Sequence, residues 1–276
     1  MVHWIWVSKS MVSAMLLDDK LIKTREVTEW QGLHLLHFDM SSCSQKVRIL
    51  IGELGINYVS HPINLMKDEQ RSDWYLGINA RGQVPVLVHD GRVHIESNDI
   101  IEYLNQTFIS PNQSFLPNSE TEQDEMHELM DLEDQLHVDL RTVTFTYLAP
   151  DPSDHAPAGD GSLDFLERFH NALLILDGKL NNQDYLIGDR ITLADISWYI
   201  TLHRLDLAGY PLSNYPSLNA YYQQIAKRPA FRQQISAGPL ILRVGGTVYR
   251  HLNRWFKNSL PKDFKRWQLA QPNTSS

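Results

Sequence analysis

The sequence predicts a mixed α/β domain followed by an all-helical domain. The length of 276 residues is that of about two domains. Apolar runs of strand type alternate with helical patterns only before residue 110, and from residue 120 onward every periodic segment is helical. The content of 42% apolar and 10% aromatic residues is typical of chains that fold around a packed core.

The first 31 residues show neither a helical nor a strand period, and their charges cancel. We interpret them as an N-terminal extension, and a start of translation at Met11 or Met15 explains them equally well. Lys9 interrupts their apolar patches and no basic residue precedes these patches, so the segment is a poor secretory signal.

A strand, a helix and a second strand are predicted next. Leu33–Phe38 is a short apolar run typical of a buried strand. The helix after it begins among serines suited to N-capping and ends at Gly55, since glycine favours the position after a helix. Its apolar residues recur at helical spacing: Val47, Leu50, Ile51 and Leu54. Ile56–Ile63 is the second strand.

A hairpin and a helix complete the first domain. Pro85–His89 and Arg92–Ile95 are apolar runs separated by Asp90-Gly91, a dipeptide that supplies both positive φ angles of a type I′ turn. Ser97 then caps a helix with apolar residues on one face, and the domain ends near Ser110.

Four helical segments follow in the second part, at 126–147, 163–180, 192–207 and 218–226. The predicted boundaries are 1–31 for the extension, 32–110 for the first domain, 111–120 for a linker, 121–238 for the helical domain and 239–276 for a basic C-terminal extension. The pattern of that extension predicts a helix packed on the rest of the protein, or a lid over an acidic or aromatic substrate. Its apolar stripe comprises Val248, Leu252, Trp255, Phe256 and Leu260.

Composition excludes several classes of function. The net charge of −8 disfavours binding to nucleic acid. The single cysteine, Cys43, cannot form an internal disulfide or a thiolate metal cluster, so we expect no metal and a reducing cytoplasmic location. No apolar run reaches the ~18 to 20 residues of a membrane-spanning helix.

Three motifs resemble the soluble glutathione S-transferases. Asn79–Leu87 and Ile95–Ile100 resemble the glutathione site of that family, and Gly188–Asp195 resembles the N-capping box of its second domain. The resemblance covers about 33–236. It implies a thioredoxin-like domain followed by an all-helical glutathione transferase C-terminal domain, a cis Val84-Pro85 peptide, glutathione as cosubstrate, and a homodimer or heterodimer.

The resemblance also assigns residues to glutathione. The backbone of Val84 is expected to pair with the cysteinyl backbone of the peptide, next to Gln83 and Pro85. Ser97 is placed at the γ-glutamyl carboxylate and Glu96 at the ammonium. The alternative is that Ser97 is only an N-cap and Glu96 only an acid that favours the helix dipole.

Lys67 and Gln70 match positions that contact the glycyl end of glutathione in theta-like members. Both are long polar residues in a predicted loop, so a solvated surface role is the alternative. Gln70 stands where some classes have histidine.

Three residues compete for activation of the glutathione thiol. Ser41 matches the catalytic serine of the plant phi and tau classes and also the cysteine of the reductase classes, so a thiol-based reductase mechanism loses its nucleophile there. A second alignment, with bacterial β-aryl etherases of the superfamily, puts the serine on Ser44. Cys43 lies between them in the first helical turn, where the pKa of a thiol is depressed; a small buried residue is the alternative.

In the second domain, Thr192 and Asp195 form a capping box, to which we assign a structural role. The electrophile is expected to meet the first long helix of this domain. The candidates are His137, Arg141, Phe145 and Tyr147, with Trp255 and Phe256 of the tail, and a solvated helix surface is the alternative.

The predicted function is that of a glutathione transferase acting on a small hydrophobic electrophile, aromatic or a β-aryl ether. A non-catalytic subunit of the same fold, acting in binding or in a heterodimer, is one alternative. A reductase that uses Cys43 as nucleophile is another.

Overall fold

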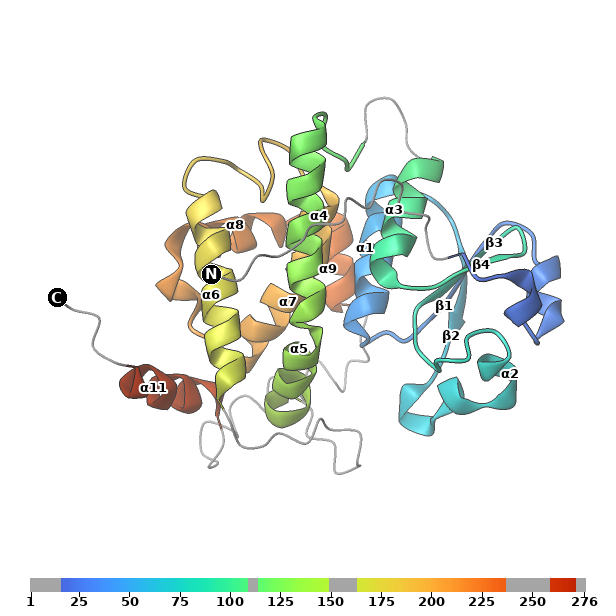
Figure 1. The fold of residues 1–276 in the computed structure, drawn as a ribbon, viewed down its shortest axis with the longest axis horizontal. Helices are drawn as coiled ribbons and strands as arrows, with labels where there is room; N and C mark the ends of the chain where they lie inside the picture. The colour runs from blue at the N-terminus through green and yellow to red at the C-terminus, as the bar shows by residue number, and fades with distance from the viewer. Residues whose placement is uncertain (1–15, 109–113, 149–162, 237–258, 272–276) are drawn as a thin grey trace, which may run out of the picture. The chain divides into compact units, whose positions relative to one another are not determined.

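A computed structural model describes residues 16–108, 114–148, 163–236 and 259–271. The chain divides into two compact units, Met1–Ile109 and Ser110–Ser276. Figure 1 shows the strands gathered in the first unit and helices making up the second. The predicted fold class, a thioredoxin-like domain followed by an all-helical domain, is confirmed.

The first unit is built on a mixed four-stranded sheet. The strands are β1 (Leu33–His37), β2 (Val59–Pro62), β3 (Val86–His89) and β4 (Arg92–His94), in the spatial order β2-β1-β3-β4. β1 pairs parallel with β2 and antiparallel with β3, and β3 pairs antiparallel with β4. Its helices are α1 (Ser42–Leu54), α2 (Asp73–Leu76) and α3 (Ser97–Phe108), of which α1 and α3 pack side by side (Figure 1).

Both ends of α1 and the turn of the hairpin form as the sequence predicts. The Ser41 side chain caps α1, and Gly55 ends it in the left-handed conformation with φ +66°. Asp90 and Gly91 both have positive φ, as the type I′ turn requires. The predicted strand from Ile56 to Ile63 is shortened to β2, because the Ile56 N–H bonds back to the α1 carbonyl of Ile51.

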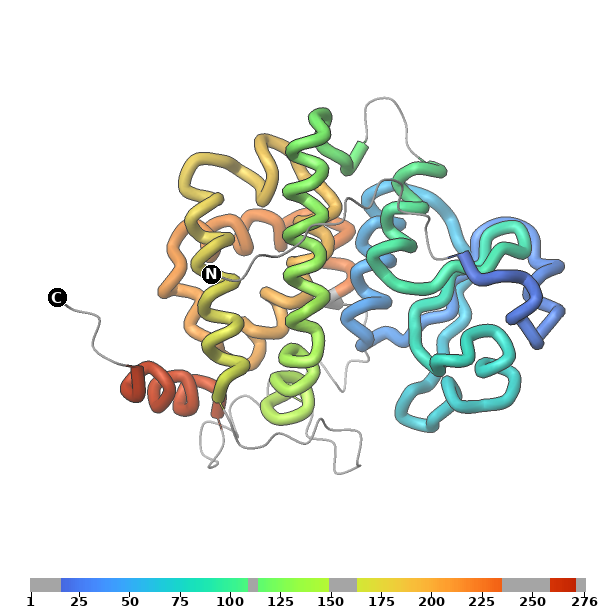
Figure 2. The backbone as a smooth tube through the Cα atoms, viewed as in Figure 1, coloured from blue at the N-terminus to red at the C-terminus, as the bar shows by residue number. Residues whose placement is uncertain are grey.

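Residues 17–30, here called the N-terminal segment, pack onto the first unit. Two short 3₁₀ helices, Asp19–Leu21 and Arg25–Glu29, bring Ile22 and Val27 into its core. The backbone N–H groups of Lys23 and Thr24 donate to the Gly77 carbonyl at 2.7 and 3.1 Å. In Figure 2 this segment is the dark blue part of the tube. Further 3₁₀ turns, Leu65–Lys67 and Glu69–Arg71, precede α2.

All the secondary-structure elements in the described residues of the second unit are helices or helical turns. Its elements are α4 (Glu120–Gln135), α5 (His137–Val143), a π-helical turn (Thr144–Leu148), α6 (Asp164–Lys179), α7 (Leu193–Ala208), a 3₁₀ turn (Leu212–Asn214), α8 (Pro216–Ile225), α9 (Pro229–Ser236) and α11 (Leu260–Ala270). The helix predicted as one piece over 126–147 is broken at Leu136. Because α7 is buried around most of its circumference, it forms the centre of this unit.

The predicted capping box at the start of α7 is present. Asp195 Oδ2 accepts from the backbone N–H of Thr192 at 2.6 Å and from its hydroxyl at 2.9 Å. Asp195 Oδ1 also accepts from the Leu186 N–H and the Tyr221 hydroxyl. Burial raises the pKa of this carboxyl, whereas its four donors lower it. The box is therefore part of a larger buried network.

The tail contributes one described helix to this unit. α11 buries Leu260, Phe264 and Trp267, and Tyr147 of the π-helical turn donates to its Asp263 at 2.8 Å. The other predicted members of the tail stripe, Val248, Leu252, Trp255 and Phe256, lie outside the described residues. In the part of the chain that the structure describes, no helix is long and apolar enough to cross a membrane, and no group of three metal-ligating side chains occurs.

Candidate functional site

The turn between β1 and α1 presents the three candidates for activation in different environments. Ser41 is half-buried, and its Oγ accepts from the Ser44 N–H at 3.3 Å. Among the described residues, its hydroxyl hydrogen has no acceptor. Ser44 is fully buried and its Oγ accepts from the Phe38 N–H at 3.4 Å, whereas Cys43 is half-buried. Both serine hydroxyls thus act as acceptors, and partial exposure distinguishes Ser41 from the fully buried Ser44.

A buried arginine fixes the backbone before Ser41. Arg48 Nη2 donates to the Asp39 carbonyl at 2.9 Å, and Nη1 contacts the Asp39 carboxylate at 3.3 Å and His37 Nδ1 at 2.7 Å. His37 Nε2 contacts Ser60 Oγ on β2 at 2.7 Å. Burial first, and then the Arg48 charge, lower the pKa of His37 to about 4. The β1–α1 turn is therefore tied to both strands of the parallel pair.

The Val84-Pro85 peptide is cis, as predicted. The residue before it is held by its main chain, because the Gln83 carbonyl accepts from the Tyr75 hydroxyl at 2.7 Å and from Asn79 Nδ2 at 2.9 Å. The Gln83 side chain is exposed, Val84 is half-buried and Pro85 is buried. The loop thus fixes its backbone while it leaves the Gln83 side chain in solvent.

The start of α3 differs in detail from the prediction. Ser97 is the first residue of the helix rather than its cap, and the Glu96 carbonyl accepts from the Ile100 N–H at 2.9 Å. Glu96 precedes the helix in the left-handed region with φ +65°. Its carboxylate forms an ion pair with Arg81, while the Ser97 side chain is largely buried. An acidic and a hydroxyl side chain thus lie at this helix start, and the basic side chain of Arg81 reaches it from the loop before β3.

The two predicted contacts for the glycyl end differ in burial. Gln70 is only 9% exposed; its Nε2 donates to Asp68 Oδ1 at 3.2 Å, and its Oε1 is a buried acceptor with no partner among the described residues. The Gln70 carbonyl lies 3.1 Å from where a Cβ on Gly82 would be, so this residue adjoins the loop before Val84. Lys67 is exposed. A buried unpaired acceptor is costly, and a ligand donor would satisfy it.

These residues of the first unit are joined by specific contacts. Lys46 of α1 is buried and its Nζ donates to Asn98 Oδ1 at 2.9 Å, which connects the N-terminal halves of α1 and α3. The helix start that carries Ser41 is thereby linked to the one that carries Ser97. The loop of Gln83 meets the same helix start through the pair of Arg81 and Glu96.

The candidates for binding the electrophile belong to the second unit. His137 and Arg141 lie four residues apart on α5, where His137 is half-buried and Arg141 exposed. Phe145 is half-buried and lies in the π-helical turn, as does the buried Tyr147. Single turns of π-helix occur often at functional sites.

Sequence reasoning did not single out Arg81, Arg48 or His37. Arg81 lies inside the quoted motif, but an arginine in a loop carries no signal of its partner. Arg48 occupies a helix position that bears a charge among apolar neighbours, and a charge at such a position signals a buried pair.

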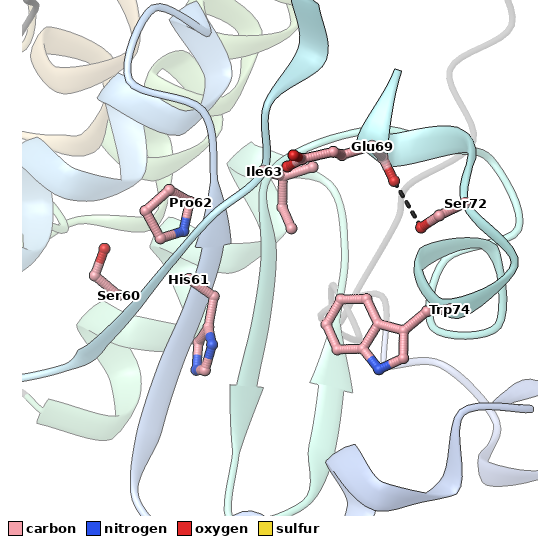
Figure 3. Close-up of a pocket in the computed structure, with 7 residues that line it drawn as sticks. All are labelled: Ser60, His61, Pro62, Ile63, Glu69, Ser72 and Trp74. Carbon is pink, nitrogen blue, oxygen red and sulfur yellow. Dashed lines mark hydrogen bonds between the residues drawn. The ribbon is translucent and has the colours of Figure 1, made fainter. Parts of the chain in front are cut away.

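A separate pocket of about 430 Å³ lies beside the edge strand β2. Figure 3 shows His61 with Ser60 and Pro62 on the left and Trp74 with Ser72 on the right, and Glu69 above Ile63 between them. None of the predicted site residues lines this pocket.

Residues 40–107 match the family pattern described as "Glutathione S-transferase, N-terminal domain", and residues 137–224 match "Glutathione S-transferase, C-terminal domain". The protein LigF of Sphingobium sp. is 28% identical over 236 residues, which cover 73% of this chain and 92% of LigF. A probable maleylacetoacetate isomerase of Caenorhabditis elegans is 29% identical over 191 residues, covering 69% and 87% of the two chains.

Solved structures give the same picture. The crystal structure of the β-etherase LigF has a TM-score of 0.62 and 26% identity, and the match covers 75% of this chain and all of that one. A possible glutathione S-transferase from Rhodopseudomonas palustris has a TM-score of 0.57 and 28% identity, and the match covers 72% of this chain and 95% of that one.

Proposed function

Because this chain belongs to the glutathione S-transferase family, we propose that it is a glutathione transferase in which Ser41 stabilises the glutathione thiolate. The observation that carries the proposal is the Ser41 hydroxyl, which lies at the first turn of α1 with no acceptor among the described residues. The same turn offers backbone N–H groups at the positive end of the helix dipole.

The free energy by which Ser41 and the helix start must stabilise the thiolate follows from the required pKa shift. A free thiol has a pKa near 8.5, and lowering it by about 2 units requires roughly 2.7 kcal/mol of selective stabilisation of the thiolate. A hydroxyl that donates to the sulfur supplies one charge-assisted hydrogen bond, and the helix start adds to it. The thiolate then attacks the electrophilic carbon, a C–S bond forms, and the leaving group departs with the electron pair of the broken bond.

The three candidates for activation of the glutathione thiol differ in how deeply they are buried, and this difference ranks them. Ser44 is fully buried with its oxygen facing the Phe38 N–H, so it reaches a ligand only if the turn opens. Cys43 is half-buried in the first turn and remains the candidate of a reductase mechanism. Ser41 needs neither a movement nor a redox partner, and we place it first.

The rest of the glutathione site lies on the loops after α1. We assign the peptide backbone of glutathione to the main chain of Val84, between Gln83 and Pro85, and its γ-glutamyl end to Glu96 and Ser97. The unpaired Oε1 of Gln70 supports a contact with the glycyl part, with the exposed Lys67 nearby in sequence. Each assignment has matching donor or acceptor chemistry.

We further propose that the electrophile is a small aromatic or β-aryl ether and that His137, Arg141 and Phe145 contact it. The β-etherase name of a relative 28% identical to this chain supports an ether. Isomerases named for maleylacetoacetate, 29% and 27% identical, make isomerisation of an unsaturated acid the second candidate activity. A homodimer and a cytoplasmic location are proposed with this function.

The thiolate absorbance of bound glutathione, followed against pH, tests the proposal. Wild-type protein is compared with S41A, C43A and S44A. Ionisation well below the free pKa in wild type, lost in S41A alone, supports the assignment. Loss in S44A instead moves the role to Ser44. A glutathione mixed disulfide that C43A abolishes supports the reductase, and absence of thiolate in every form supports a non-catalytic binding subunit.

Turnover distinguishes the two candidate activities. A β-aryl ether should release its phenol with formation of a glutathione thioether, which consumes glutathione in equal amount. A cis-unsaturated diacid should convert to its trans isomer without consuming any. Measuring glutathione consumption beside product formation therefore separates them.

A further inference from the structure

The pocket beside β2 has a chemistry of its own, separate from the residues assigned to glutathione. Its volume of about 430 Å³ is within the range of small-molecule sites in proteins. Pro62, Ile63 and Trp74 supply apolar surface, and His61 and Trp74 lie on opposite sides of the pocket (Figure 3). The lining that the structure describes holds one carboxylate, that of Glu69, and neither lysine nor arginine. Its charge therefore favours a cation over an anion.

The hydrogen bonds of His61 leave one of its ring nitrogens as an acceptor. His34 Nε2 contacts the Gln31 carbonyl at 3.0 Å, and because a carbonyl only accepts, that nitrogen carries the ring proton. In the neutral ring His34 Nδ1 is then an acceptor, and His61 Nε2 donates to it at 2.9 Å. Burial, and then the neighbouring His34, lower the pKa of His61, which keeps its ring neutral at pH 7. His61 Nδ1 therefore carries a lone pair, with no donor among the described residues.

Ring stacking holds His61 in this position. Trp30 stacks on both imidazoles, with ring centroids 4.6 Å from His34 and 4.5 Å from His61 and interplanar angles of 27° and 11°. His34 belongs to β1 and His61 to β2, so the stack also spans the two parallel strands. The orientation of the Nδ1 lone pair is thus fixed before a ligand arrives, and binding does not have to order this side chain.

Trp74 and Glu69 add two further groups that attract a cation. Trp74 is held by its Nε1, which donates to Glu26 Oε1 at 2.6 Å, while 38% of the residue remains exposed. The face of an indole attracts cations more strongly than that of any other side-chain ring. Glu69 Oε2 accepts from the Asn64 N–H at 2.7 Å, and Oε1 has no donor among the described residues. An aromatic face, a carboxylate oxygen and an imidazole lone pair are therefore available in one pocket.

The ligand that complements these groups is a primary ammonium on an apolar body. Such an ammonium combines a positive charge with three N–H donors, whereas a neutral alcohol lacks the charge and a quaternary ammonium lacks the donors. We propose that the pocket binds a small arylalkylamine whose ammonium donates to His61 Nδ1. The Trp74 ring and the Glu69 carboxylate attract its charge, and its apolar body lies along Pro62 and Ile63. This is a second binding function of the first unit, independent of glutathione.

Calorimetric titration of the full chain with 2-phenylethylamine tests the proposal. Two analogues isolate its parts: 2-phenylethanol has the same body without the charge, and trimethyl(2-phenylethyl)ammonium has the charge without N–H donors. We expect the alcohol to bind about tenfold more weakly than the amine, and the quaternary ammonium about fivefold more weakly. Either analogue binding as tightly as the amine would overturn the proposal, as would absence of binding at about 10 mM amine.

Three substitutions place the amine in the pocket. W74L, H61F and E69Q should each raise its Kd about fivefold. E69Q keeps an oxygen that can accept from the Asn64 N–H, so its effect reports the charge of the lining. E29Q is the matched control, because Glu29 is an exposed acid of the same unit that does not line the pocket, and it should leave the Kd unchanged. Equal affinities of E69Q and E29Q would overturn the proposal.

Titration in saturating glutathione distinguishes this pocket from the glutathione site. The Kd of the amine should stay the same, since none of the residues assigned to glutathione lines the pocket. Displacement of the amine by glutathione would overturn the proposal. Neither result changes what the thiolate absorbance reports about Ser41, so the proposed function stands or fails separately.

Discussion

Arg48 donates to Nδ1 of His37 over 2.7 Å, and this bond fixes the protonation state of the imidazole. A guanidinium has donors only, so Nδ1 accepts and the ring proton lies on Nε2. Nε2–H then donates to Ser60 Oγ on β2. A directed chain of hydrogen bonds therefore runs from the β1–α1 turn, through β1, to the edge strand.

Replacing Arg48 should weaken both the fold and the proposed thiolate site. R48M leaves the Asp39 carbonyl and His37 Nδ1 without their donor, and we expect a loss of about 2 kcal/mol in the free energy of unfolding. We also expect the pKa of bound glutathione to rise toward its free value, because the turn before Ser41 loses its anchor. Urea unfolding and thiolate absorbance measure the two effects.

R92M serves as the control for R48M, since Arg92 is exposed. A stable R48M protein with an unchanged thiolate pKa would show that the turn positions Ser41 without Arg48.

Stability should fall on mild acidification. Burial lowers the pKa of both His37 and His94 to about 4 from 6.5. Between these values the unfolded chain binds protons that the folded histidines do not, so the free energy of unfolding decreases as the pH falls from about 6.5 to 4. Each histidine contributes roughly 3 kcal/mol to this loss. Urea unfolding at several pH values measures the slope, and a flat profile over this window would contradict the assignment.

His94 offers a substitution that should stabilise the protein. Its ring is 2% exposed, stacks on Tyr103 at 3.9 Å, and has no hydrogen-bond partner on either nitrogen within the described residues. H94F keeps a ring there and removes two unpaired polar atoms, so we expect a gain of about 1 kcal/mol or more at pH 7 and a shallower acid profile.

The neighbouring His89 gives the opposite expectation and is the matched control. Its Nδ1 bonds the Tyr103 hydroxyl at 2.6 Å, so H89F should destabilise the protein. If H94F lowers the melting temperature as much as H89F does, then the unpaired nitrogens of His94 do not destabilise the protein.

The two residues of the capping box should contribute unequally to the free energy of unfolding. T192A removes one hydroxyl and should cost about 0.5 to 2 kcal/mol. D195A leaves buried donors of Leu186, Thr192 and Tyr221 unpaired, and we expect more than about 3 kcal/mol. Chemical unfolding measures both, and because the box lies in the second unit, glutathione affinity of the folded variants should not change. Equal losses would limit the role of Asp195 to capping.

Sequence reasoning located the features that depend on local chemistry. Gly55 after α1 and Asp90-Gly91 in the hairpin are recognisable because positive φ restricts the residue type. The motif around Val84-Pro85 also stood out, since its residues are contiguous. The helix predicted over 126–147 was wrong at Leu136 and at the π-helical turn, because a break within an apolar repeat leaves the period almost unchanged.

Contacts between distant positions were beyond sequence reasoning. The carboxylate of Glu96 meets Arg81, and the two share no local pattern. The N-terminal segment has no period because single side chains, Ile22 and Val27, reach the core from short 3₁₀ turns. Such packing depends on where residues 74–77 lie in space.

The N-terminal segment also restricts which amino acid can occupy position 77. Gly77 has φ −71°, a conformation open to any amino acid, yet a Cβ there would lie 2.2 Å from the Thr24 hydroxyl oxygen. Glycine is required at that position by a neighbour fifty-three residues earlier rather than by its own backbone. In a relative without this segment, selection on position 77 is relaxed, so larger residues at 77 should be found where nothing corresponding to Thr24 packs against it.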